Sequence, residues 1–222
     1  MSERGPSSGS GPSSGSGFSR DPLWVVKLGG SLAHTTFLPS WLEAIAQGGG
    51  RLIVVPGGGA FADAVRTEQR AHRFDDATAH RMALLAMEQY AAMLCGLERA
   101  LLPADTIDAL RDAVSRERVP IWLPARLVLA DPGIEASWDV TSDSLAAWVA
   151  GEIGAEAVIL VKATSIETAC TADALARAQI VDRAFPAYRA RCGCECWIVG
   201  AAEHGAFRRA LRDGKPPGVP VL

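Results

Sequence analysis

The chain has 222 residues, of which 49% are hydrophobic and 21% charged, so it can bury one sizeable core and a single domain is the default expectation. Its 22 basic and 25 acidic residues give a net charge of −3 without long blocks of one sign, which argues against nucleic acid or anionic lipid as partners. The sequence shows neither the roughly 18-residue apolar run of a membrane-spanning helix nor the apolar stretch of a secretory signal, so we expect a cytoplasmic protein that acts on small molecules.

The N-terminal segment predicts a tail rather than folded structure. Residues 1–17 contain an imperfect double GPSSGSG unit with almost nothing to bury. We therefore expect a flexible tail over residues 1–20 and one folded domain over residues 21–222.

The folded part alternates short apolar runs with longer helical patterns, which is typical of an α/β protein with a mostly parallel sheet. Between the second and third predicted strands, apolar residues recur at helical spacing from Ala83 to Leu101, which favours a packed helix over a Met-lined pocket. Later helices are expected over residues 142–153 and 203–212, the second ending at Gly214. The five predicted strands cover residues 23–28, 51–55, 119–123, 157–161 and 194–199.

Two glycine turns follow the first two predicted strands, VVKLGGS at residues 25–31 and VVPGGG at residues 54–59. Glycines allow backbone N–H groups to approach an anion closely, and a following helix N-terminus attracts it, although such turns also need glycine for purely conformational reasons. Neither turn matches the P-loop pattern. Residues 57–62 fit the loose dinucleotide pattern G-x-G-x-x-A, but Asp75 and Asp76 fall at the start of the long helix and not at a strand end, so a dinucleotide site is rejected.

Lysine is scarce, which makes its positions informative. Only Lys27, Lys162 and Lys215 are lysines, and the other 19 basic residues are arginines. Lys27 and Lys162 stand at the polar ends of two predicted strands, where ligands bind in parallel sheets, and a compact ammonium suits a transferring phosphoryl group. The alternative is two strand-end lysines that extend their ammonium groups to solvent.

Between these lysines in sequence, WDVTSDS at residues 138–144 opens a predicted helix. Thr141 or Ser142 is a suitable N-cap, and Asp143 suits the helix dipole, which is a sufficient structural explanation. The functional hypothesis is that Asp143 holds both lysines while hydroxyl groups of this turn reach phosphate oxygens. Phosphoryl transfer depends mainly on such placement of charge.

The five cysteines are odd in number, and three of them form the run Cys192-Gly193-Cys194-Glu195-Cys196, a poor layout for a disulfide framework. We therefore expect reduced thiols. The run could bind a soft metal ion, but neither a histidine nor a further cysteine pair stands nearby in sequence to complete a tetrahedral set. A strand that enters the core is the favoured interpretation.

In this order, the motifs VVKLGGS, VVPGGG, TSDSLAAWVA and VILVKAT resemble the amino acid kinase family, which includes acetylglutamate kinase, uridylate kinase and isopentenyl phosphate kinase. The resemblance implies a three-layer α/β/α sandwich, Mg²⁺-ATP as the phosphoryl donor, paired subunits, and Lys27, Asp143 and Lys162 as the catalytic residues. It further implies ATP-phosphate contacts at Lys27, Gly29, Gly30, Ser31, Thr141, Ser142 and Lys162, and an acceptor site at Gly57, Gly58 and Gly59.

Within the family, the short chain and residues 79–90 are most similar to the kinase that converts an aminomethyl-furanmethyl phosphate into its diphosphate in methanofuran biosynthesis. That similarity implies a phosphomonoester acceptor, which Arg66, His72 or His80 could help to bind, although each is expected to be an ordinary surface residue. Of these, we predict Arg66 and His80 as acceptor-binding residues.

The sequence departs from the family after Lys162, where residues 162–168 read KATSIET and lack the Val-Asp-Gly turn of many relatives, and near the end, where Gly218-Val219 replaces a Gly-Thr pair. The first departure motivates a second hypothesis, a non-catalytic small-molecule or oxyanion binding protein on the same fold. A third, an NAD-dependent oxidoreductase, rests only on the loose glycine pattern.

Overall fold

The computed structural model describes residues 22–222, so the predicted tail over residues 1–20 lies outside the described residues. In this range the chain forms a seven-stranded sheet in the order β3-β4-β2-β1-β5-β6-β7, and only the β6–β7 pair is antiparallel. The strands are β1 (Trp24–Leu28), β2 (Leu52–Pro56), β3 (Leu101–Ala104), β4 (Val119–Trp122), β5 (Ala157–Lys162), β6 (Glu195–Gly200) and β7 (Val219–Pro220).

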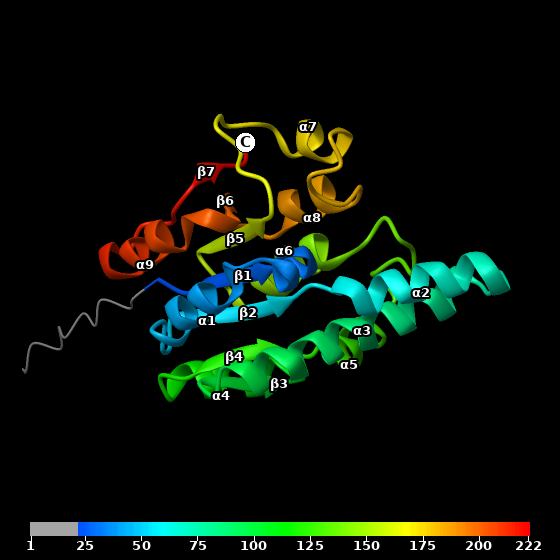
Figure 1. The fold of residues 1–222 in the computed structure, drawn as a ribbon, viewed down its shortest axis with the longest axis horizontal. Helices are drawn as coiled ribbons and strands as arrows, with labels where there is room; N and C mark the ends of the chain where they lie inside the picture. Colours follow the sequence, from blue (N-terminus) through cyan, green and yellow to red (C-terminus); the bar gives the residue numbers. More distant parts are fainter. Residues whose placement is uncertain (1–21) are drawn as a thin grey trace, which may run out of the picture.

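Helices cover both faces of this sheet (Figure 1). Short 3-10 helices also form at Gly30–His34 (η1) and Ala201–Glu203 (η2). The α-helices are α1 (Leu38–Ala46), α2 (Gly59–His72), α3 (Asp76–Leu97), α4 (Ile107–Ser115), α5 (Ala125–Val128), α6 (Ser142–Ile153), α7 (Ala172–Arg177), α8 (Phe185–Arg191) and α9 (His204–Asp213).

The central strands are buried on both faces, which explains why they read as continuous apolar runs. Along β1, Val25 packs into the core beneath α4, α6 and α8, whereas Trp24 and Val26 pack beneath α1 and α9. The three-layer α/β/α sandwich is therefore confirmed, with one apolar core on each side of the sheet.

The five predicted strands are confirmed to within one residue at each end, and α6 has the predicted bounds. The prediction was wrong at Leu101, which begins β3 instead of continuing the long helix, because α3 ends at Leu97. α3 begins as predicted, since the Asp75 carboxylate accepts a 2.6 Å hydrogen bond from the Thr78 N–H. α9 ends as predicted, at Gly214 in the left-handed conformation.

α2 and α3 pack against each other as a helical pair that extends beyond the sheet (Figure 1). Only Val65 of α2 is buried, so this helix lies mostly in solvent. The pair forms an arm beside the carboxyl ends of β1 and β2. Within residues 22–222, no helix is both long and apolar enough to cross a membrane.

Candidate active site

The sheet brings Lys27 and Lys162 to the same face. β1 and β5 are neighbouring parallel strands, with Lys27 opposite Leu160 in the register. Side chains two residues apart in a strand share a face, and Val25 and Leu160 both pack in the core beneath α6. Lys27 and Lys162 therefore also face α6, near the carboxyl ends of their strands.

Asp143, in the first turn of α6, lies between the two lysines. Its Oδ1 is 3.0 Å from the Lys27 ammonium, and its Oδ2 accepts a 2.6 Å hydrogen bond from the Lys162 ammonium. Lys27 is 6% exposed and Asp143 4% exposed, so this is a buried cluster and not a pair of solvent-facing lysines. The Lys27 contact is close enough for an ion pair but not aligned as a hydrogen bond, which leaves Oδ1 without such a partner among the described residues.

The charges of this cluster shift the pKa values of its members. Burial alone would raise the pKa of Asp143, but the ammonium groups of Lys27 and Lys162 lower it to about 2. Burial and the positive charge of Lys27 lower the pKa of Lys162 to about 8, although Asp143 and Asp182 act in the opposite direction. With both lysines protonated, the cluster carries one net positive charge, which attracts an anion.

Asp182, which the sequence analysis missed, caps the helix that carries Asp143. Its Oδ2 accepts hydrogen bonds from the backbone N–H groups of Thr141 and Ser144, each 3.0 Å long. The Thr141 hydroxyl donates to the same oxygen at 2.8 Å, and the Ser144 hydroxyl donates to Oδ1. Burial and the nearby Asp143 charge raise the pKa of Asp182, and the hydrogen bonds from the Ser144 hydroxyl, the Ser144 N–H and the Thr141 hydroxyl oppose the rise.

The predicted N-cap is therefore only partly right. Thr141 occupies the N-cap position of α6, but its side chain makes no cap hydrogen bond to the helix. The Asp182 carboxylate, 41 residues later in the chain, accepts the hydrogen bonds at the start of this helix instead. No local sequence pattern could have indicated Asp182, because the contact exists only after the loop before α8 packs against α6.

The two glycine turns pack directly against each other. A Cβ atom on Gly30 would lie 2.1 Å from the Gly59 nitrogen, and one on Gly57 would lie 2.5 Å from the Gly30 nitrogen. Gly59 has a φ of +53°, which side chains rarely adopt. Gly57 also donates a 2.8 Å backbone hydrogen bond to Leu28, so the two turns form one continuous backbone surface.

Two adjoining cavities open at this end of the sheet. The smaller, of about 310 Å³, lies against the glycine turns and α2–α3, and the larger, of about 880 Å³, lies against α7 and the start of α8. Thr141, Arg66 and Trp138 line both cavities, so they mark the boundary between them. Cavities of about 300–1,000 Å³ are typical of small-molecule sites.

The predicted site residues distribute over these cavities as follows. Asp143 lines the larger one, whereas Lys27, Lys162, Gly29 and Gly57 line neither cavity. A Cβ atom on Gly29 would lie 3.6 Å from the Lys27 ammonium, so this turn lies beside the lysine cluster. Residues from both turns, from α2–α3 and from the start of α6 line the smaller one: Gly30, Ser31, Gly58, Gly59, Arg66, His80 and Ser142.

The expectation that His80 lies on the surface was wrong. His80 is 6% exposed. Burial lowers its pKa, and a hydrogen bond to the Ser137 backbone partly opposes this effect. The neutral imidazole is the form that burial favours. Arg66 is exposed, as expected, and so is His72, which lies 3.3 Å from Glu68 and lines neither cavity.

Trp138 is a second residue whose role the sequence did not reveal. The guanidinium of Arg66 lies 3.9 Å from the centre of its ring, and its Nε1 donates a 2.6 Å hydrogen bond to the Gln69 side chain. These contacts hold the loop before α6 against α2. Trp138 therefore fixes both the wall between the cavities and the orientation of Arg66.

Comparison with known proteins places these features in a family. The model of the amino acid kinase family matches residues 22–166, which include Lys27, Asp143 and Lys162. A curated relative, [5-(aminomethyl)furan-3-yl]methyl phosphate kinase of Methanocaldococcus jannaschii, is 30% identical over 142 residues. That match covers 61% of this chain and 63% of the relative's length.

Solved structures show the same fold at lower identity. Uridylate kinase from Archaeoglobus fulgidus has a TM-score of 0.69 at 15% identity, covering 90% of this chain and 100% of the other. UMP kinase from Ureaplasma parvum has a TM-score of 0.66 at 15% identity, with coverages of 91% and 99%. An isopentenyl phosphate kinase has a TM-score of 0.59 at 16% identity, with coverages of 90% and 100%.

Proposed function

This chain belongs to the amino acid kinase family, a family of phosphotransferases, and we propose that it transfers the γ-phosphoryl group of ATP to a small phosphomonoester. The observation that carries the proposal is the buried Lys27–Asp143–Lys162 cluster beside two adjoining cavities. One cavity would hold the donor and the other the acceptor. The lysine cluster borders the larger cavity through Asp143, to which both ammonium groups are paired.

In the proposed reaction, a phosphate oxygen of the acceptor forms a bond to the γ-phosphorus of ATP. The bond between that phosphorus and the β–γ bridging oxygen breaks, and ADP leaves with the electron pair. Since a phosphomonoester is already an anion near neutral pH, no side chain need remove a proton. Lys27 and Lys162 would neutralise the charge on the transferring group, and Asp143 would hold both ammonium groups in position.

We assign the donor to the larger cavity and the acceptor to the smaller one. Gly30, Ser31 and Ser142, which are among the predicted ATP-phosphate contacts, line the smaller cavity, so the γ-phosphoryl end of ATP would extend into it. The larger cavity has the volume that a nucleotide needs, and it reaches the cluster through Asp143 and Thr141. The smaller cavity is bounded by the second glycine turn and by the N-terminus of α2, where backbone N–H groups favour an anion. Arg66, held by Trp138, offers a guanidinium to an acceptor phosphate.

Mg²⁺ fits this site through the nucleotide and not through a carboxylate cage. Asp143 is paired with two lysines, and Asp182 already accepts four hydrogen bonds. Phosphate oxygens of ATP and water molecules would therefore supply its ligands, since this ion usually keeps several waters. When bound, Mg²⁺ would neutralise phosphate charge alongside the two lysines.

For the acceptor, we propose an aminomethyl-furanmethyl phosphate, in keeping with the name of the relative from M. jannaschii. Such a molecule carries a phosphate at one end and an amine at the other. The smaller cavity offers both counterparts from one face of α2, since Asp63 and Arg66 are three residues apart and both line it. Asp63 would pair with the amine and Arg66 with the phosphate.

The test is ADP release by the purified chain with Mg²⁺-ATP and this acceptor, with the diphosphate product identified by ³¹P NMR. UMP and isopentenyl phosphate serve as competing acceptors, and GTP as a competing donor. We expect Asp63→Asn to raise the acceptor KM while leaving the ATP KM unchanged. Turnover of UMP alone would refute the acceptor, and binding of ligands without ADP release would favour the non-catalytic alternative.

We also propose that the protein acts in the cytoplasm and that it forms a homo-oligomer. The family resemblance supports the second part. Analytical ultracentrifugation of the purified chain tests the assembly. A monomer at micromolar concentration would contradict it.

A further inference from the structure

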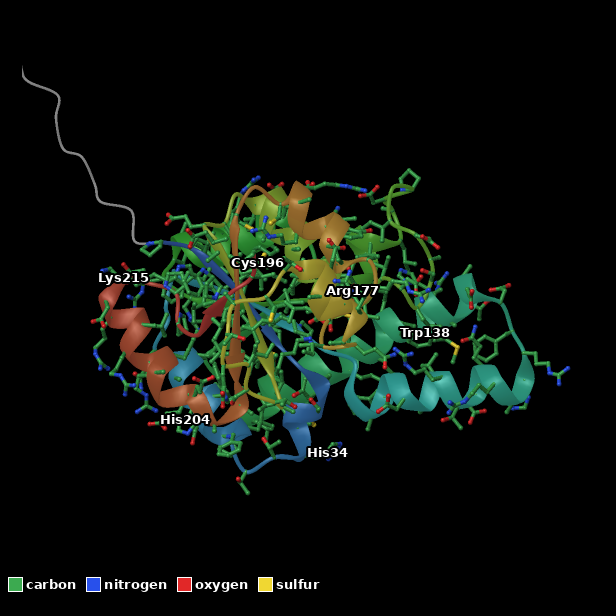
Figure 2. All side chains as sticks on the ribbon, turned by 90° about the horizontal axis from the view of Figure 1, so that it is seen from above. His34, Trp138, Arg177, Cys196, His204 and Lys215 are labelled. Carbon is green, nitrogen blue, oxygen red and sulfur yellow. The ribbon has the colours of Figure 1, made fainter. Side chains whose placement is uncertain are left out.

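Three cysteine sulfurs gather at the far end of the sheet from the lysine cluster. The Sγ atoms of Cys192, Cys194 and Cys196 all lie within 4.8 Å of one another, and those of Cys192 and Cys194 are 2.8 Å apart. All three residues are free thiols in the structure. In Figure 2, Cys196 lies well away from Trp138 at the candidate active site.

The local backbone explains how a C-x-C-x-C run brings three sulfurs together. Residues two apart in a strand share a face, which places Cys194 and Cys196 on the same side as the chain enters β6. Gly193 has a φ of +67°, and this left-handed turn folds Cys192 back toward the other two. A glycine at position 193 is therefore needed for the three sulfurs to come together.

We propose that Cys192, Cys194 and Cys196 form a binding site for a thiophilic d¹⁰ cation, Zn²⁺ or Cu⁺. Thiolates are the ligands that these ions prefer. Because a Zn–S bond is about 2.3 Å long, the sulfurs of a tetrahedral site lie about 3.8 Å apart. The distances among the three sulfurs, from 2.8 Å up to at most 4.8 Å, include this value. Zn²⁺ would take a solvent molecule as its fourth ligand, whereas Cu⁺ is satisfied by three thiolates.

The surroundings of the cluster suit a charged, accessible metal centre. Cys192 lines a cavity of about 360 Å³ and Cys194 one of about 590 Å³, so an ion can reach the sulfurs from outside. Three thiolates with either ion leave a net negative charge. Arg191 lines the first cavity and Arg189 the second, and the Arg189 Nε is buried with no hydrogen-bond partner among the described residues.

A bound ion would connect α8 to β6, since Cys192 is the C-cap of α8 and Cys196 lies within β6. It would also support α6, because a Cβ on Gly151 of that helix would come within 3.3 Å of the Cys192 Cα. α6 carries Asp143, and Asp182 lies just before α8. The site is therefore placed to stabilise the helices that border the larger cavity, without touching the reacting groups.

The experiment uses the full chain, reduced and stripped of metal, and titrates Zn²⁺ and Cu⁺ separately against a competing chromophoric chelator. Co²⁺ serves as a spectroscopic probe, because thiolate ligands give it intense charge-transfer absorption. The variants are Cys192→Ser and Cys194→Ser, which avoid the buried Cys196. Cys95→Ser is the control, since Cys95 is a half-buried thiol on α3 outside the cluster.

We expect one ion per chain, thiolate-to-cobalt absorption, and a loss of affinity of about 100-fold or more in each cluster variant but not in Cys95→Ser. Zn²⁺ or Cu⁺ should also raise the melting temperature of the parent chain and of Cys95→Ser only. Absence of stoichiometric binding of either ion would overturn the proposal. So would equal affinity in the cluster variants, or a Cys192–Cys194 disulfide that forms on mild oxidation in a chain with no metal affinity.

Discussion

Replacement of Asp143 by asparagine tests the proposed mechanism most directly. The change keeps the shape of the side chain but removes the negative charge that lies 3.0 Å from Lys27 and 2.6 Å from Lys162. Two buried ammonium groups would then face each other without a counter-charge. We expect the pKa of Lys162, already lowered to about 8, to fall further, because the opposing effect of Asp143 is lost.

The magnitude follows from the burial of the cluster. Removing one partner of a buried ion pair costs about 3–5 kcal/mol, which is a large part of the stability of a domain. Loss of a placed charge at a reacting centre typically lowers turnover by about 10²–10³-fold. We therefore expect Asp143→Asn to be folded but destabilised, with kcat reduced by about two to three orders of magnitude.

The assay is ADP release from pH 6 to pH 9.5, with thermal unfolding measured in parallel. In the parent chain, kcat/KM should fall above about pH 8 as Lys162 loses its proton, and in Asp143→Asn this fall should begin at lower pH. The matched control is Asp112→Asn, since Asp112 pairs with Arg116 on the exposed face of α4. A folded Asp143→Asn variant with normal turnover and an unchanged pH profile would refute the reasoning.

Three further predictions concern the glycine turns, the cap of α6 and the acid sensitivity of Asp143. Gly30→Ala should abolish turnover and lower the melting temperature, because the new Cβ would lie 2.1 Å from the Gly59 nitrogen. The control is Gly96→Ala in α3, whose Cβ would meet nothing within 4 Å, so this change should be neutral or stabilise the chain by about 0.5–1 kcal/mol. Asp182→Ala should destabilise the chain by about 1–3 kcal/mol in urea titrations, since it leaves the N-terminus of α6 uncapped, and Asp182→Asn should recover part of that loss. The pKa of Asp143 in the folded chain is about 2, below its ordinary value of 3.8. The ionised Asp143 should therefore stabilise the folded state fully above about pH 4, and this contribution should be lost as the pH falls toward 2. The prediction would be contradicted if the unfolding free energy of Asp143→Asn varied with pH in the same way as that of the parent chain.

The sequence was most informative where one strand or helix carried the whole signal. The central strands are continuous apolar runs because both faces are buried, and α6 has a clear start at Thr141 and an end at Gly154. The two strands that were not predicted, β3 and β7, lack such a signal. β3 is a short edge strand that contains Pro103 and directly follows a long helix, and β7 has only two residues, one of them proline.

The chemistry of the candidate site divides in the same way. Residue type and position were enough to select Lys27 and Lys162 at two strand ends and Asp143 at the start of a helix, because a parallel sheet brings the carboxyl ends of its strands to one edge. The contacts of Asp182 with α6 and of Trp138 with Arg66 join segments about 40 or more residues apart, and the burial of His80 depends on its neighbours. Such contacts carry no local pattern, since they arise only when separate elements pack together, and so the tertiary structure alone decided them.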